Sequence, residues 1–151
     1  MQEQPRILSL DVGTKTIGVA VSDPLGLTAQ AVETIRRQSM AQDLAQLQRL
    51  VQLYNPERFV VGYPLSMSGS PGPQAQFVET FVEHLRGLAL PIDYIDERLT
   101  TKQAATALIA SGMRRDKRKA VIDQQAAVLI LQSYLDRRSR LQASPDAPLE
   151  P

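Results

Sequence analysis

The stretch that decides the fold is residues 7–23, which read ILSLDVGTKTIGVAVSD. Two apolar runs rich in β-branched residues flank a Gly-Thr-Lys turn, and this pattern predicts a β-hairpin. Strand alternation places Asp11 on the same face as Ile7 and Ser9, just before the turn. Burying a carboxylate alone costs several kcal/mol, so it needs a partner. Asp11 therefore either caps the turn or pairs with Lys15, or it belongs to a site that other carboxylates complete.

The composition fits one ordinary globular domain. Of the 151 residues, 43% are hydrophobic and none is cysteine, which excludes a disulfide framework and a thiolate zinc site. No long apolar run precedes Asp11, so we expect no signal peptide, and the longest apolar run, 126–131, is too short to cross a bilayer. We expect one cytoplasmic domain over residues 1–138 with no membrane partner, followed by a disordered, proline-containing tail over residues 139–151.

Charge is distributed unevenly, although the net charge is only +1. Residues 113–140 hold eight basic and three acidic residues, a net charge of +5, which leaves −4 for the rest of the chain. Five of the six residues from 114 to 119 are basic, namely Arg114, Arg115, Lys117, Arg118 and Lys119. A solvated loop is one interpretation of this run. Because its charges would repel one another, we favour contact with a polyanion such as nucleic acid.

The rest of the chain alternates strands with helices. Short apolar runs predict further strands at 27–35, 58–63 and 92–95, and helical stripes or capping boxes predict helices at 39–54, around 77–88, at 100–112 and at 120–138. Three antiparallel strands followed by two parallel ones describe an α/β fold, a five-stranded mixed sheet with helices on both faces. Right-handed crossovers place strand 7–12 near the centre, with Asp11 close to the edge where such sheets bind ligands.

Two later carboxylates could meet Asp11. Glu97 lies in an Asp-Glu-Arg triplet that directly follows the fifth strand, although such a triplet is usually a solvated turn. Asp123 shares a helical stripe with small and apolar residues, namely Ala126, Ala127, Ile130 and Tyr134. A carboxylate on that stripe faces the sheet, where it is either a core residue paired with an arginine or part of a site.

Three acids converging from two strands and a helix suit a hard divalent cation. Mg²⁺ and Mn²⁺ prefer oxygen ligands, and carboxylates are their usual side-chain source. Two such ions about 4 Å apart can activate a water and stabilise the leaving oxygen of a phosphodiester. Residues 114–119 would hold the polyanion backbone, and Thr14 and Lys15 in the hairpin turn could contact phosphate oxygens.

Several blocks of the sequence, in order, resemble the YqgF/RuvX family of RNase H-like nucleases. The matching blocks are LDVGTK at 10–15, GVAVSD at 18–23, VVGYPL at 60–65 with Met67 and Gly69, DERLTT at 96–101, and Asp123 with Ala126, Ala127, Leu131 and Gln132. Each block alone is weak, but together they span residues 7–136. One departure is Ser66 and Ser68 in the loop, where the family has Asn and Asp.

The resemblance implies an RNase H-like fold and a metal-dependent endonuclease acting on structured nucleic acid. Its three acidic positions, catalytic and metal-binding, fall on Asp11, Glu97 and Asp123. The family is associated with 5′-end maturation of pre-16S rRNA, which would make ribosomal precursor particles its partners, and by older analogy with resolution of Holliday junctions in branched DNA. Glu97 should lie two strands, about 10 Å, from the first strand. It must therefore reach inward or join when substrate and metal are present.

Two other classes of function remain open. A non-catalytic RNA-binding ribosome-assembly factor would keep the basic run without cleavage. An Asp-x-Gly-Thr hairpin, here residues 11–14, also occurs in sugar kinases and actin-like ATPases. That fold needs two lobes around an adenosine site, and 151 residues supply one. Binding of ATP by the isolated chain would revive this alternative.

Overall fold

The computed structural model describes residues 4–65, 69–96 and 115–143, and within the last range the side chains of residues 125–141. Its sheet has five strands in the order β3-β2-β1-β4-β5. The strands are β1 Ile7–Val12, β2 Thr16–Ser22, β3 Ala29–Arg36, β4 Arg58–Tyr63 and β5 Ile92–Asp96. The first three pair antiparallel, and β4 and β5 continue the sheet in parallel from β1. The predicted hairpin, the mixed sheet and the central place of the first strand are confirmed.

The described helices are α1 Met40–Tyr54, α2 Pro73–Leu85, the 3₁₀ turn η1 Arg86–Leu88 and α4 Arg115–Ala143. The capping box that starts α1 is present, because the Gln42 amide donates to Ser39 Oγ at 3.1 Å. Asn55 ends α1 in a left-handed conformation, with φ at 49°. The helix predicted at 100–112 lies outside the described residues.

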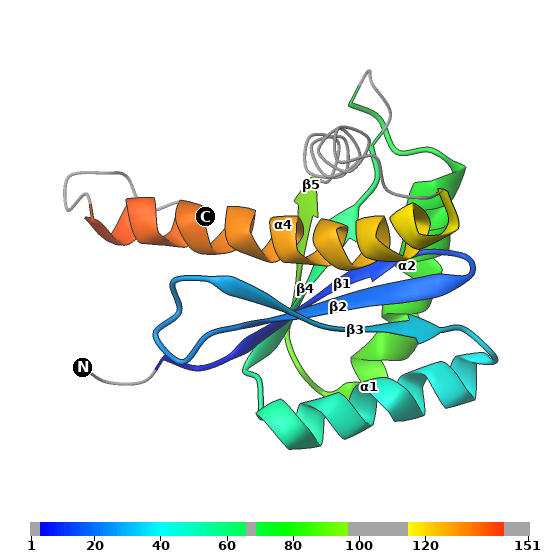
Figure 1. Cartoon of the computed structure of the whole chain (residues 1–151), viewed down its shortest axis with the longest axis horizontal. Coiled ribbons are helices and arrows are strands. Elements are labelled where there is room, and N and C mark those ends of the chain that lie inside the picture. The colour runs from blue at the N-terminus through cyan, green and yellow to red at the C-terminus, as the bar shows by residue number, and fades with distance from the viewer. Residues whose placement is uncertain (1–3, 66–68, 97–114, 144–151) are drawn as a thin grey trace.

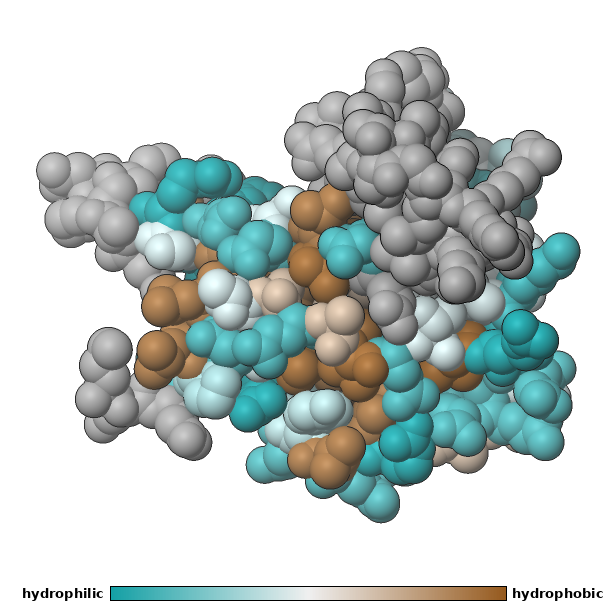
Figure 2. All heavy atoms as spheres, viewed as in Figure 1, coloured by the Kyte–Doolittle hydropathy of each residue, from teal (hydrophilic) through white to brown (hydrophobic). Residues whose placement is uncertain are grey.

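Helices cover both faces of the sheet, as predicted, and divide the interior into two cores (Figure 1). On one face, α1 and α2 pack over large side chains of β1, β2 and β4 such as Leu10, Ile17 and Phe59. On the other face α4 crosses the sheet over a smaller core that includes Ile7, Ala20 and Val60. The outer surface seen in Figure 2 has apolar residues between polar ones along α4.

The last helix is longer than predicted at both ends. It begins at Arg115 and not near residue 120, so the basic residues from 115 to 119 are helical and do not form a loop that precedes the helix. It continues to Ala143, so residues 139–143 are not part of a disordered tail. Arg, Lys and Ala are good helix formers, and no glycine or proline occurs between 115 and 143; the next proline is Pro145.

No helix within the described ranges is both long enough and apolar enough to span a bilayer.

Candidate active site at the carboxyl end of the central strand

Asp11 lies on the central strand, one residue before β1 ends. It is partly exposed, whereas Leu8, Ser9 and Leu10 before it are fully buried. Ser9 Oγ donates to the Ala127 carbonyl at 2.7 Å, so this face of β1 is the one that α4 covers. Strand alternation puts Asp11 on the same face, two residues further toward the edge of the sheet.

Glycines flank Asp11 on both neighbouring strands. On β2 its register partner is Gly18. On β4 the parallel register pairs Leu10 with Val61, so the next residue, Gly62, lies level with Asp11. Neither of these two strands therefore places a side chain beside the Asp11 carboxylate. On β5, Ile95 pairs with Gly62 and so lies at the same level of the sheet as Asp11.

A cavity of about 440 Å³ opens at this edge of the sheet, between the β1–β2 turn and the start of α2. Its lining includes Asp11, Gly13, Thr14, Lys15, Gln74 and Phe77. The turn is closed by a hydrogen bond from the Gly13 amide to the Thr16 carbonyl at 2.9 Å. A Cβ at Gly13 would lie 3.0 Å from that carbonyl oxygen, which explains the glycine. Thr14 and Lys15 are exposed beside the cavity.

The hydrogen bonds of α4 fix its direction across the sheet. Gln132 accepts from the Ala29 amide and donates to the Leu27 carbonyl, both at 3.0 Å, near the amino end of β1. Ala127 contacts Ser9, further along β1. Toward its own amino end, α4 therefore runs toward the edge of the sheet that carries Asp11, where Figure 1 also places the β1–β2 turn.

The predicted helical stripe is confirmed over the residues with described side chains. Ala126, Ala127 and Ile130 are fully buried, and Tyr134 is half-buried. Asp123 is a helical residue of α4, one turn before Ala127, and its side chain lies outside the described set. The same holds for the side chains of Arg115, Lys117, Arg118 and Lys119.

Glu97 and Arg114 lie outside the described residues altogether. The strand that precedes Glu97, β5, is two positions from β1 in the sheet, as predicted. Within the described ranges, no three acidic, histidine or cysteine residues gather into a possible metal site. Of the three predicted acids, the structure therefore describes the side chain of Asp11 alone, and the convergence of the three stays a prediction.

A family model described as "RuvX: Holliday junction resolvase" matches residues 5–137. This chain belongs to the RuvX family. Among its relatives, a protein of Moorella thermoacetica is 56% identical over 133 residues, which cover 87% of this chain and 95% of that protein. A protein of Heliobacterium modesticaldum is 52% identical over 139 residues, covering 91% and 93%. Both are named "Putative pre-16S rRNA nuclease". The RuvX family is one of nucleases, hydrolases that act on phosphodiester bonds.

Solved structures confirm the RNase H-like fold of this RuvX chain. RuvC of T. thermophilus in complex with a Holliday junction substrate superimposes with a TM-score of 0.57 at 14% identity, covering 91% of this chain and 97% of RuvC. The large terminase nuclease of the thermophilic phage G20c superimposes with a TM-score of 0.52 at 12% identity, covering 88% and 85%. At such identities the likeness establishes the fold alone.

A buried ion pair beside the RuvX site was missed by sequence reasoning. Asp43 of α1 is only 2% exposed and pairs with Arg37, with Arg37 Nε 2.9 Å from Asp43 Oδ2. Asp43 shares a helical stripe with Leu47 and Leu50, both buried. A carboxylate on an apolar stripe was the signal that singled out Asp123, and the same signal could have found Asp43.

A second polar cluster lies under α4, away from Asp11. Arg58 donates to Asp93 Oδ2 at 2.7 Å, and this hydrogen bond raises the pKa of Arg58. Tyr134 also donates to Asp93 Oδ2, at 3.2 Å, and burial raises the pKa of its phenol. Asp93 is thus occupied by two donors that join β4 and α4 to β5, which is a structural role.

Proposed function

We propose that this RuvX family member is a metal-dependent endonuclease that cuts structured RNA, and that 5′-end maturation of pre-16S rRNA is its reaction. Two relatives are named as pre-16S rRNA nucleases and are more than 50% identical to this chain, which covers nearly the whole length of each. Such a substrate implies the cytoplasm as compartment and ribosomal precursor particles as partners.

The observation that carries the catalytic assignment is the register between β1 and α4. Ser9 is hydrogen-bonded to Ala127, and Asp11 lies two residues further along β1, a rise of about 6.6 Å. Asp123 lies four helix residues from Ala127, about 6 Å along the axis, toward the same edge of the sheet. The carboxylates of Asp11 and Asp123 would thus lie at the same level along the sheet, where Gly18 and Gly62 carry no side chains.

The donor set fits Mg²⁺ or Mn²⁺, because Asp11, Asp123 and Glu97 would supply only hard carboxylate oxygens. When bound, such an ion would polarise a water and neutralise charge on the phosphodiester. Thr14 and Lys15, exposed at the turn, would contact phosphate oxygens beside the scissile bond. Arg114, Arg115, Lys117, Arg118 and Lys119 would hold the nucleic-acid backbone at the amino end of α4.

A single-turnover cleavage assay tests this proposal. The substrate is a 16S precursor RNA with its 5′ extension, in Mg²⁺ or Mn²⁺, and the variants are Asp11→Asn, Glu97→Gln and Asp123→Asn. Asp23→Asn serves as the control, because Asp23 lies in the β2–β3 connection, outside the site. We expect cleavage by the wild type and the control and loss of cleavage in the three variants. Equal activity in all of them would remove the catalytic assignment.

One alternative substrate is favoured by the fold. RuvC, which superimposes on this chain, was solved with a Holliday junction, and the family model carries the resolvase description. A four-way DNA junction therefore belongs in the same assay, and preferential cleavage of that junction would replace RNA as the substrate. Tight RNA binding without cleavage in either metal would instead support the assembly-factor alternative.

Salt dependence tests the basic residues separately from catalysis. Replacing Lys117, Arg118 and Lys119 by alanine should weaken RNA binding and reduce the slope of log affinity against log salt by about 1 per lost phosphate contact. Arg49→Ala is the control, since Arg49 lies exposed on α1, against the opposite face of the sheet. An unchanged slope in the triple variant would exclude this contact.

A further inference from the structure

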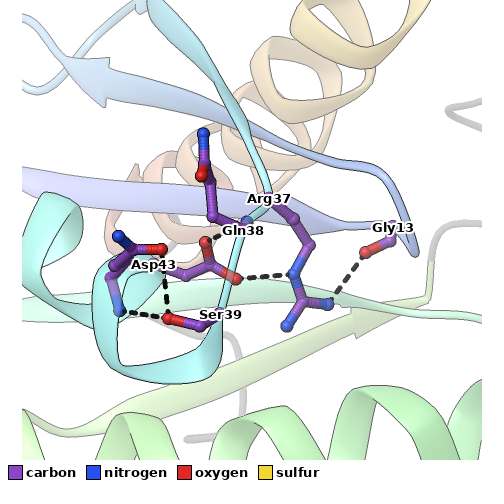
Figure 3. A network of polar contacts seen from close by, with 6 residues as sticks. Gly13, Arg37, Gln38, Ser39 and Asp43 are labelled. Carbon is purple, nitrogen blue, oxygen red and sulfur yellow. Dashed lines mark hydrogen bonds and ion pairs between the residues drawn. The ribbon is translucent and has the colours of Figure 1, made fainter.

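Arg37 connects the β1–β2 turn to α1 (Figure 3). The Arg37 backbone amide donates to the Lys15 carbonyl at 2.9 Å. Its guanidinium Nη1 donates to the Gly13 carbonyl at 3.0 Å. Arg37 therefore binds the turn at two points, one on each side of Thr14.

The other edge of the same guanidinium is held by α1. Arg37 Nε donates to Asp43 Oδ2 at 2.9 Å, and the Gln38 amide donates to Asp43 Oδ1 at 3.0 Å. Asp43 is 2% exposed and the Arg37 side chain 12%, so water screens this pair little. Since both carboxylate oxygens are occupied, the direction in which Arg37 extends toward Gly13 is fixed.

Two aromatic rings of α2 also contact the Arg37 guanidinium. Its central carbon lies 5.4 Å from the ring centre of Phe77 and 5.1 Å from that of Phe81. Both distances are within the range of cation–π contacts. Phe77 also lines the cavity that opens beside Asp11. The guanidinium is thus held by β3–α1 and α2 together while it hydrogen-bonds to the turn.

We infer that Arg37 is a positioning residue of the nuclease site, which acts through the Gly13 carbonyl. Asp11 lies two residues before Gly13, and Thr14 and Lys15 follow it, so the position of the Gly13 carbonyl bears on all three. An apolar side chain in place of the buried ion pair would often be as stabilising. The Arg37–Asp43 pair, which is directed at the turn, is therefore better explained by positioning of the site than by a gain in stability. This inference rests on the proposed function.

Arg37→Lys tests the inference with the charge conserved. A lysine ammonium can still neutralise Asp43, but it lacks the planar fork that reaches Asp43 and Gly13 together. Arg49→Lys is the matched control, because Arg49 also joins α1 to β3, through an exposed pair with Glu33 at 2.9 Å. The readouts are hydrogen exchange of the 10–17 peptide, Mn²⁺ binding to the protein without nucleic acid, and the metal dependence of cleavage.

We expect Arg37→Lys to stay folded while the amides of the turn exchange faster. The dissociation constant for Mn²⁺ and the half-saturating Mn²⁺ for cleavage should both rise about 10- to 100-fold, as for other groups that orient a metal site. Arg49→Lys should match the wild type in each readout. Unchanged exchange and unchanged Mn²⁺ binding in folded Arg37→Lys would overturn the inference.

A second variant keeps the test decisive if Arg37→Lys does not fold. Arg37→Met combined with Asp43→Asn removes both charges, and the asparagine oxygen still accepts from the Gln38 amide. This pair should fold and show the same faster exchange at the turn and the same weaker Mn²⁺ binding; wild-type values would refute the inference. A wild-type protein that binds Mn²⁺ but cleaves neither RNA nor branched DNA would contradict the proposed function and leave these two readouts valid.

Discussion

The two faces of the sheet are covered in different ways. Beneath α1 and α2 the contacts are made by large, fully buried side chains such as Leu47, Phe59 and Phe81. Beneath α4 the sheet has the small residues Ser9 and Ala20 beside Ile7 and Val60, and side-chain hydrogen bonds at Ala127 and Gln132 hold α4 in addition to packing. Small residues let the helix approach closely, and hydrogen bonds define its register.

Under the proposed function, one face of the sheet would contribute mainly to stability and the other would carry the catalytic residues. Large apolar side chains contribute most of the free energy of folding, because burial scales with apolar area. Among the described residues, the α4 face has the smaller buried cluster, but it carries Asp11, and the Ser9–Ala127 contact fixes the register of α4 along the sheet. Substitutions on the two faces should therefore separate loss of stability from loss of activity.

The largest effect is expected for Asp11→Asn on the α4 face. Cleavage should fall by roughly 10³-fold or more, as for residues that act as a catalytic unit. The free energy of unfolding should change by about 1 kcal/mol or less, because the side chain is partly exposed. Single-turnover rates and urea denaturation measure the two quantities. A loss of stability as large as the loss of activity would contradict the proposed separation.

Leu47→Ala tests the opposite face. Leu47 is fully buried in α1, and its truncation should destabilise the protein by about 2–5 kcal/mol. The cleavage rate constant of the folded fraction should stay close to that of the wild type. Urea denaturation and assays well below the melting temperature check both statements. A catalytic defect in the folded fraction would show that the two faces are coupled.

Ser9→Ala sharpens the comparison at the contact between β1 and α4. Losing the hydrogen bond to the Ala127 carbonyl should cost about 1 kcal/mol, and it should lower cleavage because it loosens the register of α4. Ser22→Ala is the matched control: Ser22 is equally buried, but its Oγ accepts from the Ile7 amide within the sheet. The control should lose similar stability and keep its activity; equal activity in both variants would exclude a role for the α4 register.

The smallest effect is expected at Asp23, which belongs to neither core. Asp23 accepts from the amides of Leu27 and Thr28 at 2.7 and 3.0 Å, and the hydrogen bond from Thr28 chiefly lowers its pKa. A carboxylate whose pKa is lower in the folded than in the unfolded state stabilises the fold above the unfolded-state pKa. This stabilisation is lost as the pH falls through the folded-state pKa. Asp23→Asn should therefore lower the melting temperature slightly at pH 7, and less or not at all near pH 3. A difference that grows on acidification would contradict this.

Local patterns predicted the fold where they were strong. The apolar run at Arg58–Tyr63 gave a strand with the correct bounds, and Ser39 with Gln42 gave the start of α1. The start of α4 was missed because a basic run was interpreted through charge repulsion, although its residues are good helix formers. Arg37 could not have been found from spacing, because it lies between two elements and its partners, Gly13 and Asp43, meet it only in three dimensions.

The hydrogen bond between Ser9 and Ala127 joins residues 118 positions apart. A chain still emerging from the ribosome can pair β1 with β2, but α4, which contacts Ser9, is synthesised after all five strands. Under the proposed function, the site is therefore completed only when α4 docks against β1.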